Sequence, residues 1–93
     1  MPDERSHISR EMLNKYEAAE IISARAMLLS NGATMLLSDA ERPSIHDPIQ
    51  IAAMELRMGR IDAEIVRGEE HLKVSELKLP DMVFHITKSF PRK

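Results

Sequence analysis

One helix-length segment constrains this chain more than any other, because it is apolar around its whole circumference. The segment IISARAMLL, residues 21–29, contains Arg25 as its only charged residue. A surface helix normally shows one apolar stripe, whereas a helix that is apolar on every side needs cover on every side. The rest of this 93-residue chain is too small and too polar to supply that cover. The sequence therefore predicts that part of this helix packs against another chain.

The boundaries of this helix are marked by capping residues. Asn14 lies three residues before Glu17, which is the spacing of a capping box. Asn31 and Gly32 follow the apolar segment, and glycine supplies the left-handed conformation with which many helices end. We therefore expect a helix that starts at Asn14 and stops at Asn31-Gly32.

A second helix and a hairpin are predicted further along the chain. Asp47 can cap a helix whose first residue is Pro48, and Gly59 marks its end. From Ile61 to Val74 the apolar period changes to two around a turn, which is typical of a short β-hairpin. The expected fold class is α+β and mainly helical, with two principal helices followed by a small β-hairpin.

We expect one domain with a flanking segment on each side. Residues 14–77 contain the predicted elements. Residues 1–13 are predicted to form a polar N-terminal arm, and residues 78–93 a C-terminal extension in which no clear period is seen from Pro80 onward. The small set of aromatic residues, one Tyr and two Phe, leaves the domain with a soft core.

Composition argues against several classes of site. The chain has no Cys, and its four His residues are scattered without ligand spacing, so no metal and no cofactor are predicted. No catalytic signature motif occurs, and no catalytic residue is predicted. His46, His71 and Glu55 are interpreted as solvated side chains rather than as acids or bases of an active site.

Charge and hydropathy argue against two further partners. The net charge of −2, with both signs interspersed, does not favour an autonomous nucleic-acid binder. No apolar run approaches the length of a membrane span, and residues 1–10 lack the hydrophobic region of a signal peptide. We therefore expect a soluble, intracellular protein with no membrane contact and no direct sequence-specific nucleic-acid contact.

The sequence leaves open which group accepts the hydrogen bonds of Arg25. Its neighbours on the helix are apolar, so its guanidinium needs a carboxylate or carbonyl groups to accept hydrogen bonds from its five N–H groups. One alternative is an acid of the same helix, and the other is a group on another chain. The second alternative predicts that Arg25→Glu abolishes co-purification with a partner while the helix content of the isolated domain changes little.

Two blocks of the sequence carry a family resemblance. Residues 14–33 resemble the first helix of the omega-type small subunit of multisubunit DNA-dependent RNA polymerases, in its archaeal, eukaryotic and viral branch. A later block resembles the second helix of that family and the strand after it. The matching residues are Tyr16-Glu17, Ala19, Arg25-Ala26 and Gly32-Ala33 in the first block, and Asp47-Pro48-Ile49, Ile51-Ala52, Glu55-Leu56, Arg60-Ile61, Ile65 and Arg67 in the second.

Three positions depart from the family pattern. Glu20 stands where the family usually has Arg, Leu28 where Gln is common, and Asp62 where a Pro usually follows the Ile. Because Glu20 reverses a charge, a contact normally made by that Arg must differ in this chain.

The resemblance implies a structural role without catalysis. Members of the family latch onto the largest polymerase subunit near its carboxyl-terminal region, assist its assembly and stabilise the enzyme during transcription. The implied location is intracellular, being the nucleus in a eukaryote and the cytoplasm or virion in an archaeal or viral source. Asn14, Asp47 and Pro48 are expected to cap helices. The residues expected to contact or closely pack against the partner are Tyr16, Glu17, Ile22, Arg25, Ala26, Leu29, Gly32, Ala52, Glu55 and Leu56.

An alternative from another class is a free-standing homodimeric DNA-binding transcription regulator. It would explain the over-apolar helix, but the predicted helices carry few basic residues and the net charge is negative. A small enzyme is the least favoured class, because no site for one is seen.

Overall fold

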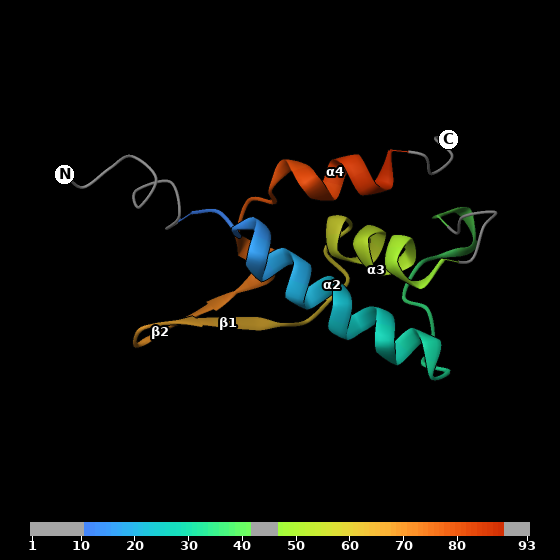
Figure 1. The fold of residues 1–93 in the computed structure, drawn as a ribbon, viewed down its shortest axis with the longest axis horizontal. Helices are drawn as coiled ribbons and strands as arrows, with labels where there is room; N and C mark the ends of the chain where they lie inside the picture. The colour runs from blue at the N-terminus through green and yellow to red at the C-terminus, as the bar shows by residue number, and fades with distance from the viewer. Residues whose placement is uncertain (1–10, 42–46, 89–93) are drawn as a thin grey trace.

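The described part of the chain contains three α-helices and one antiparallel hairpin, so the expected mainly helical α+β fold class is confirmed. A computed structural model describes residues 11–41 and 47–88. The α-helices are α2 (Lys15–Ser30), α3 (Pro48–Arg57) and α4 (Asp81–Thr87), and the strands are β1 (Glu64–Arg67) and β2 (Glu70–Lys73), as labelled in Figure 1. Two short 3-10 helices, η1 (Asp39–Glu41) and η2 (Val74–Glu76), lie in the connecting segments.

Both predicted helix starts are confirmed. The backbone N–H of Glu17 donates to the Asn14 side chain at 2.8 Å, and the N–H of Asn14 donates to the Glu17 carboxylate at 3.0 Å. This reciprocal pair is the predicted capping box of α2. Asp47 accepts the N–H of Ile49 at 2.9 Å, and Pro48 is the first residue of α3.

The predicted helix ends are also confirmed. Asn31 follows the last turn of α2, and Gly32 has a φ of 102°. Gly59 follows α3 with a φ of 72°. Both glycines lie in the left-handed region that favours this residue at the end of a helix.

The hairpin is shorter than the alternating sequence pattern. In β1 and β2, Ile65 pairs with Leu72 and Arg67 with Glu70, and Gly68 lies in the tight turn with a φ of 62°. The pattern predicted strand from Ile61 to Val74, but β1 begins at Glu64 and Val74 belongs to η2. The N–H of Val74 still donates to Ala63 at 2.9 Å, so the ladder extends one pair beyond the strands.

The helix α4 was not predicted. It packs against α3, which lies between α2 and α4 in the view of Figure 1. Val83 and Thr87, one turn apart, are its buried residues. The hydroxyl of Thr87 donates to the carbonyl of Val83 at 2.9 Å and accepts from Arg57 of α3 at 3.1 Å. This small helix therefore covers one side of α3.

The segment before α2 is part of the core rather than only a polar arm. Leu13 is fully buried, its N–H donates to the carbonyl of Lys78 at 2.8 Å, and the N–H of Lys78 donates to Glu11 at 2.9 Å. Met12 and Lys78 form a parallel bridge. The proposed arm and the proposed C-terminal extension are therefore joined to each other at residues 11–13 and 78. The remainder of the arm, residues 1–10, lies outside the described residues.

The core lies between α2, α3 and α4 and extends under the hairpin. Its buried residues are Leu13, Ala18, Ile22, Ala26, Ala52, Ala53, Leu56, Val74 and Val83. A smaller cluster forms where Leu37 packs on Ile51 of α3.

Candidate docking surface

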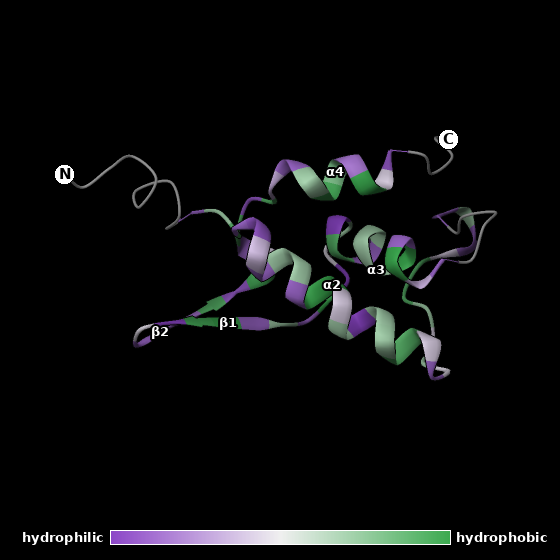
Figure 2. Ribbon diagram, viewed as in Figure 1, coloured by the Kyte–Doolittle hydropathy of each residue, from purple (hydrophilic) through white to green (hydrophobic). Residues whose placement is uncertain are grey.

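The outer face of α2 is the first candidate for contact with another molecule. Its inner face, with Ala18, Ile22 and Ala26 four residues apart, is buried in the core. Apolar residues continue along the second half of the helix (Figure 2), and Met27 and Leu28 on the outer face are 66% and 54% exposed. In the described part of the chain α2 is therefore covered on one side only.

The residues predicted to contact a partner fall into two groups. For Ile22 and Ala26, contact or close packing was expected, and the structure shows close packing within the chain. The buried group is Ile22, Ala26, Ala52, Glu55 and Leu56. The other group is Tyr16, Glu17, Arg25, Leu29 and Gly32, which are exposed or partly exposed. Contact of the second group with another chain stays a prediction.

Arg25 finds its partner on the other helix of the same chain. Its Nε donates to Oε1 of Glu55 at 2.5 Å, and its Nη2 donates to the carbonyl of Thr34 at 2.7 Å. Neither alternative left open by the sequence, an acid of its own helix or a group on another chain, describes this pair. The interpretation of Glu55 as a solvated side chain is also wrong, because Glu55 is 0% exposed.

Glu55 connects three parts of the fold. Its second oxygen, Oε2, accepts the backbone N–H of Leu36 at 2.7 Å, while Oε1 faces Arg25. A buried carboxylate is tolerated only when its oxygens receive hydrogen bonds and its charge is balanced, and both conditions are met here. The network holds α2, α3 and the segment after α2 in one arrangement behind the outer face.

A second ion pair fixes the hairpin to the start of α2. Arg67 donates from Nε and Nη2 to the carboxylate of Glu17 at 3.0 and 2.7 Å, and Nη2 also donates to the carbonyl of Met12 at 2.6 Å. The hydrogen bond from Arg67 lowers the pKa of Glu17, and the carboxylate raises the pKa of Arg67. Glu17 thus serves both as a cap of α2 and as the anchor of β1.

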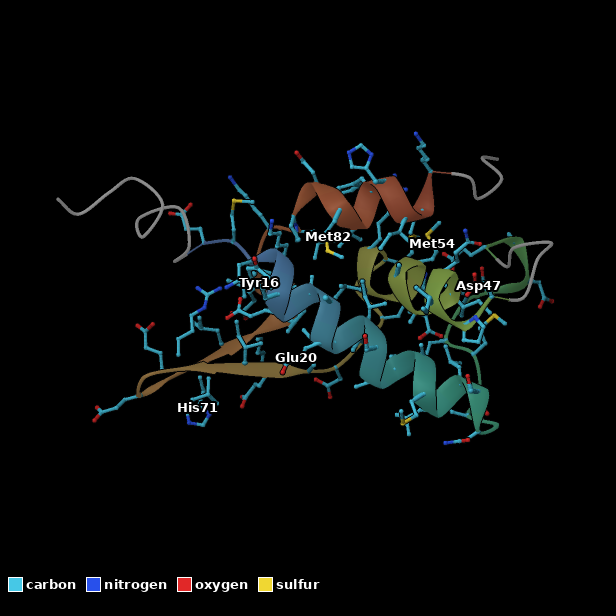
Figure 3. All side chains as sticks on the ribbon, in the orientation of Figure 1. Tyr16, Glu20, Asp47, Met54, His71 and Met82 are labelled. Atoms are coloured by element: carbon cyan, nitrogen blue, oxygen red, sulfur yellow. The ribbon has the colours of Figure 1, made fainter. Side chains whose placement is uncertain are left out.

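Exposed residues at the start of α2 lie beside this pair. Tyr16 is 74% exposed, with the ammonium of Lys15 at 5.4 Å from its ring centre. Figure 3 shows Tyr16 and Glu20 on successive turns of α2, and His71 on the hairpin. His71, interpreted from the sequence as solvated, is exposed. His46 lies outside the described residues.

A groove of about 600 Å³ runs between α2 and β1. It is open along its length and mixes carboxylates with apolar side chains. Its walls are Glu17, Glu20, Ile21 and Ala24 from α2, and Glu64, Ile65 and Val66 from β1. The α2 residues follow the spacing i, i+3, i+4 and i+7, so they form one stripe that continues toward Leu28. The groove and the exposed apolar residues therefore belong to the same side of α2.

The predicted contact residues do not include Met27, Leu28 or Arg67, and the groove was not predicted. Met27 and Leu28 were counted in the apolar segment, but their exposure depends on which side of α2 the chain itself covers. Arg67 was seen as part of a matching block, and its pairing with Glu17 spans 50 positions. A pattern of neighbouring residues cannot reveal a contact between residues so far apart in the sequence.

The described residues contain neither a cluster of metal-ligating side chains nor a membrane-spanning helix. Within residues 11–41 and 47–88, no three His, Asp or Glu side chains lie close enough together to bind one metal ion. None of the helices described is long and apolar enough to cross a membrane.

Comparison with known proteins shows which family this chain resembles. The family model described as RNA polymerase Rpb6 matches residues 8–62, which is more than half of the chain. The DNA-directed RNA polymerase subunit Rpo6 of Pyrobaculum aerophilum is 42% identical over 71 residues, covering 76% of this chain and 66% of that protein. The Rpo6 subunit of Thermofilum pendens is 37% identical over 67 residues, covering 72% and 80%. That of Sulfurisphaera tokodaii is 35% identical over 75 residues, covering 81% and 86%.

Proposed function

We propose, because this chain belongs to the RNA polymerase Rpb6 family, that it is a non-catalytic accessory subunit of a DNA-directed RNA polymerase. In this role it binds the largest subunit of the enzyme and promotes the assembly and stability of the complex during transcription. It acts inside the cell, in the compartment that holds the polymerase. The relatives named above are RNA polymerase subunits by description.

The observation that carries this proposal is the exposed apolar side of α2. Met27 and Leu28 remain largely exposed in the described structure, although they lie in the most apolar segment of the chain. Apolar side chains at the centre of an interface supply much of its binding free energy, since burial removes them from water. A helix with one face in its own core and the other face exposed is suited to join a second chain.

The inner networks support the same role by fixing the position of that face. The pairs Arg25–Glu55 and Arg67–Glu17 attach α2 to α3 and to β1. A surface held by such contacts changes little on binding, and less conformational entropy is lost when it meets a partner. Side chains such as Ile22 and Leu56 then act by packing behind the interface rather than by touching the partner.

The test is retention of the tagged chain in a purified polymerase. We expect the unmodified chain to co-purify with the largest subunit at equal stoichiometry. Met27→Glu places a charge where an apolar side chain meets the partner, and should reduce retention at least tenfold. Ser75→Glu adds the same charge at an exposed residue of η2 and should leave retention unchanged.

Two results would contradict the proposal. One is a chain that co-purifies with none of the polymerase subunits. The other is equal retention of the Met27→Glu variant and the unmodified chain, because the α2 face would then have no part in binding. Circular dichroism of both variants checks that the helix content of the free chain is preserved.

A further inference from the structure

The groove between α2 and β1 reaches an unpaired strand edge. Three consecutive residues of β1, Glu64, Ile65 and Val66, line it, and successive residues of a strand point to opposite faces of the sheet. A groove that touches all three must therefore border an edge of β1. No residue of β2 is among its walls, so this is the edge away from β2.

The hydrogen-bonding pattern shows which backbone groups lie on that edge. In an antiparallel pair, hydrogen-bonded and non-bonded residue pairs alternate along the strands. The bond from the N–H of Val74 to the carbonyl of Ala63 makes that pair a bonded one, and Ile65 opposite Leu72 is then bonded as well. The N–H and C=O groups of Glu64 and Val66 consequently point outward, and no third strand covers them within the described residues.

The side chains around this edge are acidic and apolar. Glu20 and Glu64 face the groove from opposite walls, and no side chain in the described ranges pairs with Glu20. Glu64 has only the exposed His71 at 3.3 Å. Val66 is 61% exposed beside Ile21 of α2. Arg67 balances the charge of Glu17, but no Lys or Arg is among the walls of the groove, and no cation of the described residues balances the charge of Glu20.

We propose that this groove binds an extended, basic and apolar segment of another polymerase subunit, which adds to the free edge of β1 as a third strand. The proposal rests on the proposed function, because it names the kind of segment that the accessory subunit holds. The backbone of the segment pairs with Glu64 and Val66, its Lys or Arg side chains face Glu20 and Glu64, and its apolar side chains cover Ile21 and Val66. Strand addition supplies affinity through main-chain hydrogen bonds, and the carboxylates favour a segment with positive charge.

Hydrogen exchange resolved to single amides tests the strand. The free chain is compared with the same chain in the purified polymerase. We expect the amides of Glu64 and Val66 to exchange at least tenfold more slowly in the complex. The amides of His71 and Lys73 point outward from β2 in the same hairpin, and they should exchange at unchanged rates.

A charge reversal tests the acidic wall. Glu20→Lys should lower the retention of the chain in the polymerase at least fivefold, with a larger loss at low salt, where repulsion is less screened. Glu69→Lys is the matched control, because Glu69 is an exposed residue of the hairpin turn and lies outside the groove. Its retention should equal that of the unmodified chain.

The outcomes separate this proposal from the proposed function. If the chain co-purifies with the polymerase but Glu64 and Val66 exchange as in the free chain, the strand addition is overturned and the accessory role stands. Normal retention of Glu20→Lys, or protection of the β2 edge in place of β1, overturns it as well. A chain that never enters the polymerase overturns both proposals.

Discussion

At the scale of single residues, Glu55 is the most demanding side chain in the fold. It is fully buried, and Arg25, with a side chain only 14% exposed, balances its charge. Removing one partner of a buried pair leaves an uncompensated charge, which costs about 3 kcal/mol or more. We expect Arg25→Ala to lower the free energy of unfolding by about 3 kcal/mol, measured by urea denaturation followed by circular dichroism.

The matched control for that prediction is Arg60→Ala. Arg60 pairs with Glu41 at 2.7 Å, but both side chains are partly exposed, and solvent screens such a surface pair, so its loss should cost much less stability than the loss of Arg25. If both variants lost the same free energy, the buried position of Glu55 would have no special weight in stability.

The same pair changes the expectation for Arg25→Glu. The sequence predicted that this substitution would abolish co-purification with a partner while leaving the helix content almost unchanged. In the structure it would place a second carboxylate against the buried Glu55, where little solvent is available to screen the repulsion. Reduced helix content in the isolated chain is now the expected result, so Arg25→Glu does not isolate an interface effect.

Glu17 makes stability depend on acid. Its pKa in the folded chain lies below the ordinary value of 4.5, chiefly because Arg67 donates hydrogen bonds to it. Between the folded and the unfolded pKa the unfolded chain binds more protons, so the contribution of Glu17 is present above pH 4.5 and decreases as the pH falls through the folded pKa. The difference in unfolding free energy between the unmodified chain and Glu17→Gln should therefore shrink from pH 7 to pH 3. A constant difference in urea titrations across that range would contradict this.

At the scale of elements, helix boundaries were predictable because their causes are local. Asn14 and Asp47 cap helices through neighbours two or three residues away, and Gly32 ends α2 through its own conformational freedom. The hairpin was predictable from its alternation, although its strands are shorter than the pattern. What each helix face contacts was not predictable, because Arg25 meets Glu55 across 30 positions.

The helix α4 was not predicted because it is short and its position depends on packing. Its seven residues give too little sequence to establish a helical period, and Pro80 and Lys88 provide no side-chain cap. Its position depends on packing against α3, where Arg57 both donates to Thr87 and lies 5.0 Å from the ring of Phe84.

This dependence gives a prediction for α4. Val83 is fully buried, so Val83→Ala removes apolar contacts and leaves a cavity, at a cost of about 2 kcal/mol of unfolding free energy. His85→Ala, two residues along the same helix and exposed, should change stability by about 0.5 kcal/mol or less. Thermal unfolding of the two variants measures the difference. Equal melting temperatures would mean that α4 contributes no packing.

At the scale of the whole molecule, acidic side chains on the apolar face separate the accessory role from the alternative of a DNA-binding dimer. Glu17 and Glu20 share a stripe with Leu28 on α2. In a symmetric dimer through this face Glu20 would be buried without a cation to balance its charge, and a carboxylate on the face would repel the phosphates of DNA.

We therefore expect the isolated 93-residue chain to be a monomer that does not retard duplex DNA. Light scattering coupled to size exclusion should give a mass near 10.6 kDa. Gel-shift experiments at low salt should show free DNA, with a lysine-rich peptide as positive control. A stable dimer that shifts DNA would favour the regulator instead of the accessory subunit.

The contact between residues 11–13 and Lys78 has a consequence for the order in which the protein forms. Lys78 accepts the N–H of Leu13 and donates its own N–H to the carbonyl of Glu11, although most of the fold lies between these residues in the chain. Contacts of such long sequence separation form late in folding. During synthesis the segment before α2 can make this contact only after residue 78 has left the ribosome. A chain that terminates before residue 78 would therefore lack the backbone contact that holds Leu13 in the core, although the capping box of α2 could still form.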